Sequence, residues 1–215
     1  GQTIGVIGGT GSGKSSLVSL IPRFYDATGG SVELFGHPVS DYAREQVRGD
    51  VGIVMQRAQL FSGTIRSNLL WGNPNATDDE LWQALDQAQA KEFVAEKKGG
   101  LDAPVAQNGK NFSGGQRQRL TIARALVRRP SILILDDSSS ALDYATDAAL
   151  RGAIRQLDYR PTVFLISQRT ASIRRADRIL VLEGGRVVEE GTHAELLAVR
   201  GRYAELFELQ AAGYR

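Results

Sequence analysis

The first twenty residues constrain the fold more than any other stretch. Thr3–Ile7 alternates and is rich in β-branched residues, which predicts a strand, and Ser15–Ile21 has the apolar spacing of a helix. Between them, Gly8–Ser15 matches G-x-x-x-x-G-K-[ST] in full. A strand, a glycine-rich loop and a helix in this order predict an α/β fold whose loop wraps around phosphate. A merely flexible strand–helix turn is the alternative, and the complete motif in its required context disfavours it.

The residues of this loop have distinct expected roles. The glycines let the backbone curl around phosphate groups, Lys14 places a cation against the β- and γ-phosphates, and Ser15 offers a hydroxyl to Mg²⁺. The helix that begins here adds the positive end of its dipole. The predicted nucleotide-binding residues of the loop are Gly8, Gly9, Thr10, Gly11, Ser12, Gly13, Lys14, Ser15 and Ser16.

Two polar residues follow predicted strands and are candidates for the same site. The apolar run Ile132–Leu135 ends at Asp136, a carboxylate that can hold Mg²⁺ beside the loop. Gln56 follows the strand predicted at Val51–Met55 and is a second candidate for contact with the metal or the attacking water. Each residue alone is equally explained as a polar group leaving a strand, so both assignments depend on the loop.

The stretch Ser113-Gly114-Gly115-Gln116 predicts a helix start of unusual composition. Ser113 and Gln116 have the spacing of a capping box. That explanation does not account for the glycines, since each Gly in a helix costs about 0.5–1 kcal/mol relative to Ala. The bare backbone and the positive helix end favour an anion, so we expect all four residues to contact a phosphate that another subunit holds.

The remaining periodicity predicts a helical middle region flanked by strands. The helical region extends from Asp78 to about Arg129, with one apolar stripe of Leu81, Trp82, Leu85 and Ala88 and another of Leu120, Ile122, Ala123, Leu126 and Val127. Further strands are expected at Ser31–Leu34 and Thr162–Ile166, and a hairpin is expected at Arg178–Leu182 and Arg186–Val188. Helices are expected at about Ala145–Leu157, within a βαβ unit, and from Glu195 to Gln210.

Composition excludes several classes of function. The chain has no cysteine, and its two histidines, His37 and His193, are far apart in the sequence, so neither thiolate chemistry nor a histidine metal site is expected. The 26 basic and 24 acidic residues are interspersed and give a net charge of +2, which argues against nucleic acid as a partner. One run of basic residues is interpreted as a solvated helix face: Arg117, Arg119, Arg124, Arg128 and Arg129.

Taken together, the motifs resemble the nucleotide-binding domain of ABC transporters. The resemblance rests on Gly8–Ser15, Gln56, Asn111–Gln116 and Ser140–Asp143, and it spans nearly the whole chain. It implies a P-loop NTPase (ABC ATPase) fold, with a mixed-sheet, RecA-like core at about residues 1–56 and 130–215 and an inserted helical lobe at about 57–129. It also implies ATP and Mg²⁺ as cofactors.

The family's assembly is implied by the same resemblance. A second ABC nucleotide-binding domain would be the partner, with ATP held between the loop of one subunit and the Ser113–Gln116 helix of the other, and Asp143 would lie at the dimer face. Phe61–Arg66 and Val105–Lys110 resemble the exporter branch, in which these segments meet the membrane domain. The chain starts at Gly1 and its apolar runs are too short to cross a bilayer. The resemblance to exporters implies a separate N-terminal transmembrane region and a location at the cytoplasmic face of the membrane.

Two residues depart from the family's pattern. Asp137 stands where the family has the Glu that acts as base or positions water, and a displacement of about 1 Å can lower a rate by about 100-fold. Gln168 stands where the family has the His that contacts the γ-phosphate and holds the catalytic geometry, and an amide cannot become cationic or shuttle a proton. Together they resemble the degenerate subunit of heterodimeric multidrug exporters, whose own site binds ATP and hydrolyses it slowly.

Three alternatives to the degenerate subunit stay open. The first is a fully active homodimeric transport ATPase that tolerates Asp and Gln at these positions. The second is an engineered catalytic knockout, although Asp for Glu is a mild choice for one. The third is a soluble ABC ATPase of nucleic-acid repair or translation, against which the exporter-like segments and the balanced charge argue. Gln107 stands where exporters commonly have Glu, and the sequence gives no physical explanation of this difference.

Overall fold

The computed structural model describes residues 1–138 and 140–213, which divide by compactness into two units. The first consists of Gly1–Val51, Ser131–Asp137 and Pro161–Arg215, and the second of Gly52–Pro130 and Ser138–Arg160. The second unit thus takes in residues 138–160 besides the region expected as an inserted lobe. The division into a RecA-like core and a helical lobe at the boundaries given above stays a prediction.

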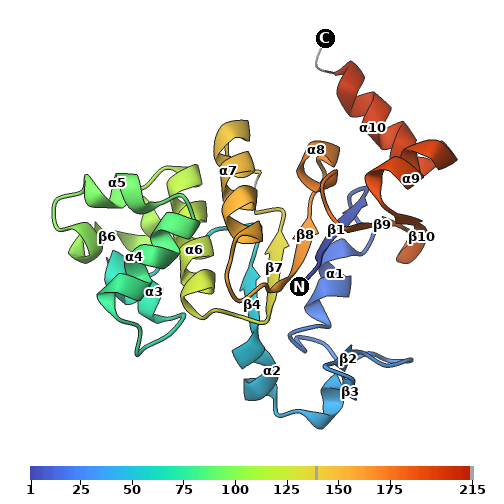
Figure 1. Cartoon of the computed structure of the whole chain (residues 1–215). Coiled ribbons are helices and arrows are strands. Elements are labelled where there is room, and N and C mark those ends of the chain that lie inside the picture. Colours follow the sequence, from blue (N-terminus) through green and yellow to red (C-terminus); the bar gives the residue numbers. More distant parts are fainter. Residues whose placement is uncertain (139, 214–215) are drawn as a thin grey trace. The chain divides into compact units, whose positions relative to one another are not determined.

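A mixed sheet forms the centre of the first unit (Figure 1). Its strands are β1 (Thr3–Gly8), β7 (Ile132–Asp136), β8 (Thr162–Ile166), β9 (Arg178–Glu183) and β10 (Arg186–Gly191). The order is β10-β9-β1-β8-β7-β4. The last strand, β4, is Val51–Val54, and its first residue is also the last residue of the first unit's N-terminal segment. β1 is parallel to β8 and β9, β7 is parallel to β8, and β10 returns antiparallel to β9. The predicted α/β fold with a mixed sheet and its C-terminal hairpin is confirmed.

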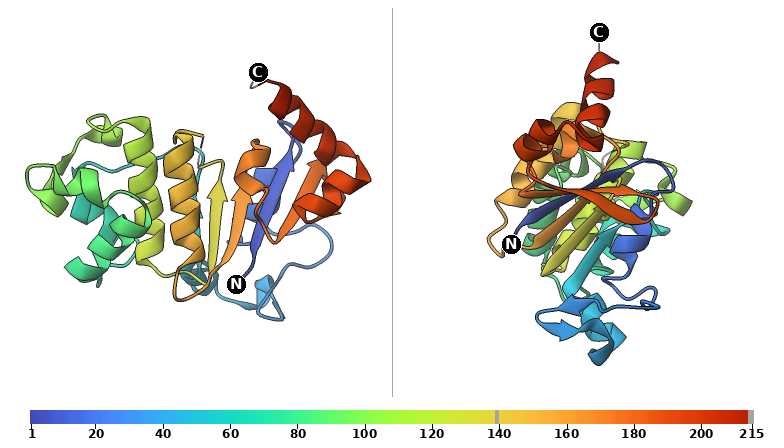
Figure 2. Two further views of the ribbon diagram at one scale, coloured as in Figure 1. Left: turned by 45° about the horizontal axis from the view of Figure 1, so that its top comes forward. Right: turned by 90° about the vertical axis from the view of Figure 1, so that its right-hand side faces the viewer.

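Short helices and a small hairpin complete the first unit. They are α1 (Lys14–Ser19), α2 (Arg44–Asp50), α8 (Thr170–Ile173), α9 (His193–Val199) and α10 (Arg202–Ala212), with β2 (Glu33–Leu34), β3 (His37–Pro38) and the 3-10 turn Val39–Asp41. Ile7, Ile173, Ile179 and the fully buried Tyr203 share one apolar core with Leu196. β1, α8 and β9 therefore pack together with the C-terminal helices, of which α10 is the last (Figure 2).

Two predictions about the first unit were wrong in detail. The helix expected from Glu195 to Gln210 is two helices, because Arg200 has a left-handed backbone (φ 55°) and Gly201 separates α9 from α10. A Cβ on Gly201 would lie 2.0 Å from a carboxylate oxygen of Glu189, so the break leaves room for that side chain. The strand expected at Ser31–Leu34 is only β2, because its partner β3 is two residues long and pairs with Glu33 and Leu34 across the turn at Phe35 and Gly36 (φ 52° and 82°).

The second unit is mainly helical. It contains α3 (Ile65–Leu70), α4 (Asp78–Gln87), α5 (Lys91–Ala95), α6 (Gly114–Val127) and α7 (Tyr144–Arg155), the strands β5 (Gly63–Thr64) and β6 (Pro104–Val105), and 3-10 turns at Gly100–Asp102 and Gln107–Gly109. α6 packs against α3 and α4, and α4 also contacts α7. Both predicted apolar stripes are buried except for the half-buried Trp82. The continuous helical region expected from Asp78 was wrong, because β6 and the 3-10 turns interrupt it before α6.

The arginines of α6 and of the two residues that follow it do not form one solvated face, which corrects the prediction. Arg128 and Arg129 are exposed, whereas Arg117, Arg119 and Arg124 are half-buried. The Arg119 guanidinium lies 4.8 Å from the centre of the Phe93 ring and donates to the Gln89 carbonyl oxygen at 2.6 Å. Because α6 has neighbours on several sides, Arg119 and Arg124 cover aromatic rings, and Arg117 donates to the carbonyl oxygen of Phe112 at 2.7 Å.

Within the described part of the chain, the helices are all too short or too polar to cross a membrane.

Candidate functional site

The loop between β1 and α1 has a backbone that requires its glycines. Gly11 and Gly13 have left-handed φ values of 77° and 96°, which favour glycine. A Cβ on Gly8 would lie 2.2 Å from the Leu182 carbonyl oxygen and 2.6 Å from Ser12 Oγ, so the start of the loop is held tightly against β9. Nothing lies within 4 Å of a Cβ on Gly9. The loop is thus held at its start and open at Gly9.

Lys14 reaches back over this loop. Its ammonium donates to the carbonyl oxygens of Gly8 and Gly9 at 2.9 and 2.8 Å, and it lies 3.3 Å from Ser12 Oγ. Desolvation lowers the pKa of Lys14, and the charges of Asp136 and Asp137 partly oppose this. The first turn of α1 has no side-chain cap, since Gly13 occupies the cap position. The loop therefore presents a cation and uncapped backbone N–H groups on one side, an arrangement suited to phosphate.

The two aspartates follow from β7. Asp136 is the last residue of the strand, pairs with Ile166 of β8 and is 6% exposed. Asp137 is half-buried, has a left-handed φ of 45° and donates its N–H to the Ile166 carbonyl oxygen at 2.9 Å. The parallel strands β1, β7 and β8 bring the loop and both carboxylates to the same end of the sheet, because parallel strands end together.

Gln168 lies two residues beyond the end of β8 with its side chain exposed. Its carbonyl oxygen accepts a hydrogen bond from Gln210 Nε2 at 2.7 Å. The Gln210 Oε1 atom accepts from both the N–H and the hydroxyl of Thr170, at 2.8 and 2.9 Å. Sequence analysis missed Gln210, and no local signal could have found it, because it lies about forty residues beyond the segment that it binds.

The helix start at Ser113 has the predicted capping box. Ser113 Oγ accepts from the Gln116 N–H at 3.2 Å, and Gln116 Oε1 accepts from the Ser113 N–H at 3.0 Å. Gly115 has a packing reason, since a Cβ there would lie 3.2 Å from the Ala141 carbonyl oxygen. Gly114 is exposed, and a Cβ there would meet nothing closer than 3.9 Å. Packing within this chain thus explains Gly115 and leaves Gly114 unexplained.

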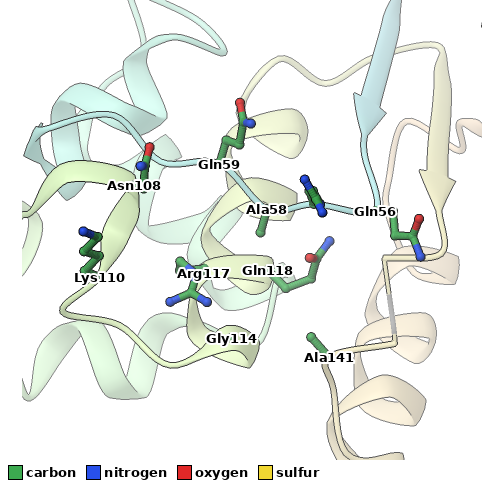
Figure 3. Close-up of a pocket in the computed structure, with 10 residues that line it drawn as sticks. Gln56, Ala58, Gln59, Asn108, Lys110, Gly114, Arg117, Gln118 and Ala141 are labelled. Carbon is green, nitrogen blue, oxygen red and sulfur yellow. The ribbon is translucent and has the colours of Figure 1, made fainter.

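A pocket of about 520 Å³ lies within the second unit (Figure 3). It is lined by Gln56, Arg57, Ala58, Gln59, Asn108, Lys110, Gly114, Arg117, Gln118 and Ala141. Three of these residues are basic and none is acidic. Gln118 is 1% exposed, and its Nε2 atom is buried without a hydrogen-bond partner among the described residues. The segment after Gln56 and the segment before Ser113 therefore border one pocket that offers positive charge and a buried donor.

The predicted site residues are divided between the two units. The loop, Asp136, Asp137 and Gln168 belong to the first, and Gln56 and Ser113–Gln116 belong to the second. Asp143 caps α7, because its carboxylate accepts from the N–H and the hydroxyl of Thr146 at 2.9 and 2.7 Å. Within the described residues there is no group of three or more His, Cys, Asp or Glu side chains that could hold a metal ion.

Comparison with known protein families decides the identity. The model of the family described as ABC transporter matches residues 1–140. The chain belongs to the ABC transporter family. This ABC transporter domain is 42% identical over 210 residues to an uncharacterized ABC transporter ATP-binding protein, YknU, of Bacillus subtilis. It is 41% identical over the same length to a provisionally named multidrug export ATP-binding/permease protein of Staphylococcus aureus.

These relatives are much longer than this ABC transporter domain. Each of the two alignments covers 98% of this chain and 36% of the relative. A solved structure of a bacterial Atm1-family ABC exporter with ATP bound matches with a TM-score of 0.94 at 36% identity, over 98% of this chain and 37% of that one. The sequence resemblance to ABC transporters and the P-loop ABC ATPase fold are thereby confirmed.

Proposed function

We propose that this chain is the ATP-binding domain of an ABC exporter, which binds MgATP at a dimer interface and couples binding and hydrolysis to export. One observation carries the proposal. The complete loop Gly8–Ser15 holds the Lys14 ammonium over its own carbonyl oxygens, with Asp136 and Asp137 close enough to affect its pKa. Phosphate oxygens would replace those carbonyls as partners of Lys14.

The chemistry of the loop fits Mg²⁺. Mg²⁺ in nucleotide sites usually takes only one or two carboxylates among a few protein oxygens and completes its shell with phosphate and water. The exposed Ser15 hydroxyl and the Asp136 carboxylate supply two such oxygens in the first unit, and Gln56 is the proposed third contact. When bound, the metal would neutralise charge on the phosphates. Lys14 and the N–H groups of residues 9–16 would hold the nucleotide against the end of β1.

The chain's own site is proposed to hydrolyse ATP slowly. Asp137 has a shorter side chain than Glu, and its backbone is fixed by the hydrogen bond to Ile166. Gln168 presents a neutral amide where the family has His. The carboxylate would therefore hold the attacking water too far from the γ-phosphate, and no cation would form at position 168 during the reaction.

The Ser113 helix is proposed to act on a partner's nucleotide. Its exposed start, the Ser113 hydroxyl and the uncrowded Gly114 suit a phosphate brought by a second ABC domain in a heterodimer. Gly114 supports this proposal most directly, because packing within the chain gives it no other reason. Asp143, which caps α7, would lie at the dimer face.

The second unit's pocket is proposed to receive the exporter's membrane part. The exporter-like segment Val105–Lys110 borders it through Asn108 and Lys110, and Gln56–Gln59, which lies just before the other exporter-like segment, Phe61–Arg66, also lines it. Its excess of basic residues and the buried Gln118 Nε2 favour a segment that carries acidic or carbonyl groups. Such docking would place this domain at the cytoplasmic face of the membrane. A name that assigns a relative to multidrug export supports, for this chain, export as the direction of transport.

Equilibrium binding of MgATP tests the proposal. Lys14→Ala should weaken MgATP binding at least about 100-fold, because it removes the cation that faces the phosphates. Lys91→Ala is the control, since Lys91 makes only a surface ion pair with Asp86 at 3.7 Å and should leave the affinity unchanged. Equal affinities of wild type and Lys14→Ala would refute the phosphate role of the loop.

A further inference from the structure

The side chain of Gln210 holds the backbone of the segment that follows β8. Its Nε2 atom donates to the Gln168 carbonyl oxygen at 2.7 Å, and its Oε1 atom accepts from the Thr170 N–H and hydroxyl at 2.8 and 2.9 Å. A backbone carbonyl can only accept and a backbone N–H can only donate, so these partners fix which end of the amide faces which group. One side chain thereby satisfies groups on both sides of Arg169.

The Thr170 N–H is the first donor of α8 and lacks a partner within that helix, as at any helix start. Arg169 occupies the cap position, and an arginine side chain has no acceptor atom. Gln210 supplies the acceptor from a different helix. On the other side, the Ser167 N–H donates to the Val6 carbonyl oxygen at 3.1 Å. Gln168 is therefore held between β1 and α10, with only its exposed side chain outside these contacts.

The helix that carries Gln210 is itself anchored at its start. Glu189 of β10 accepts hydrogen bonds from the N–H groups of Arg202 and Tyr203, the latter at 3.0 Å. Tyr203 is fully buried, and its hydroxyl lies 2.8 Å from His193 Nδ1. The first turn of α10 is thus fixed to β10 and α9, and its last turn reaches the segment after β8. α10 therefore connects β10 and α9 to the segment after β8 and can set the position of that segment.

We propose that Gln210 is a positioning residue for Gln168: it fixes the backbone from which the Gln168 amide reaches the γ-phosphate of ATP in this chain's loop. The proposal rests on the proposed function, because it takes Gln168 as a γ-phosphate contact. It predicts that α10 determines how well the site distinguishes ATP from ADP. The loop residues that hold the other phosphates lie elsewhere and make none of these contacts with Gln210.

The test compares the dissociation constants of MgATP and MgADP in the dimeric protein, because only ATP carries the γ-phosphate. Gln210→Ala should reduce the preference for ATP over ADP by about three- to tenfold, because it weakens one hydrogen bond to the γ-phosphate. It should leave the affinity for MgADP unchanged. Gln168→Ala should have the same effect, and the double variant should add nothing, since both changes remove one contact. Leu209→Ala, a change at a 70% exposed neighbour on α10, should leave the ratio unchanged.

A conservative variant separates positioning from stability. Gln210→Glu keeps two acceptors for Thr170 but places an oxygen against the Gln168 carbonyl, so it should also lower the preference for ATP. If Gln210→Ala does not fold, Gln210→Glu is used in its place. An unchanged ATP-to-ADP ratio, an equal loss for both nucleotides, or additive effects in the double variant would overturn the role of Gln210. A wild-type protein that binds neither nucleotide would instead contradict the proposed function.

Discussion

At the scale of single residues, this domain differs from its family in two side chains whose backbones are well held. Asp137 is fixed through its N–H to β8, and Gln168 through its carbonyl to Gln210. The group that holds the Gln168 carbonyl oxygen, the Gln210 side-chain amide, is neutral. We therefore propose that hydrolysis is slow because the Asp137 side chain is too short and the Gln168 side chain is uncharged, while the backbone of both residues is already in position.

Restoring both side chains should raise turnover at this site. Asp137→Glu with Gln168→His is expected to increase ATP hydrolysis by about 10- to 100-fold, because the carboxylate regains its reach and position 168 can carry a proton. Phosphate release is measured in a dimer whose other site is silenced, with each single variant beside the double. Flat turnover would show that another residue limits the chemistry. Brisk wild-type turnover that Asp137→Asn abolishes would favour the homodimeric alternative instead.

At the scale of elements, α6 is the helix around which the second unit packs. A Cβ on Gly72, just after α3, would lie 2.1 Å from the carbonyl oxygen of Arg124 in α6. The Arg124 guanidinium in turn lies 5.6 Å from the Phe61 ring centre and donates to the Gln59 carbonyl oxygen at 3.1 Å. The close backbone approach at Gly72 and the stacking of Arg124 on Phe61 together explain how an arginine-rich helix can lie at the centre of its unit.

A pair of glycine substitutions tests this packing. Gly72→Ala should destabilise the protein by about 1–3 kcal/mol or more, since the new methyl meets backbone that cannot move alone. Gly152→Ala is the matched change within α7, where nothing lies within 4 Å of the Cβ, and it should stabilise by about 0.5–1 kcal/mol. Urea unfolding measures both. Similar unfolding free energies for the two variants would contradict the close approach of α3 and α6.

At the scale of the whole molecule, the proposed site is complete only in a dimer. The chain supplies a loop with two aspartates from one unit and a capped helix start from the other. Ser113 and Gly114 are exposed, and a Cβ on Gly114 would meet nothing closer than 3.9 Å, so both residues are accessible to another subunit. The intact helix start is then the chain's larger proposed contribution to hydrolysis, made at its partner's site.

Ser113→Arg should separate these two contributions. In the assembled heterodimer it is expected to lower ATP hydrolysis at least about 100-fold, because a long side chain replaces the hydroxyl where the partner's phosphate would lie. MgATP binding to this chain's own loop should stay within about twofold of wild type. Both quantities are measured on one preparation, with phosphate release for the partner's site and equilibrium binding for the loop. Unchanged hydrolysis would refute the contact across subunits.

The sequence by itself determined the parts of this protein that are local. Gly8–Ser15, the strand that ends at Asp136 and the capping box at Ser113 are set by residues within a few positions of one another, so motif and periodicity predicted them. Only the tertiary structure decided that Gln210 holds the Gln168 segment, that Glu189 holds α10 and that Arg119 and Arg124 of α6 cover aromatic rings. Those contacts join residues far apart in the chain, and no spacing rule reports which distant side chain will supply a missing donor or acceptor.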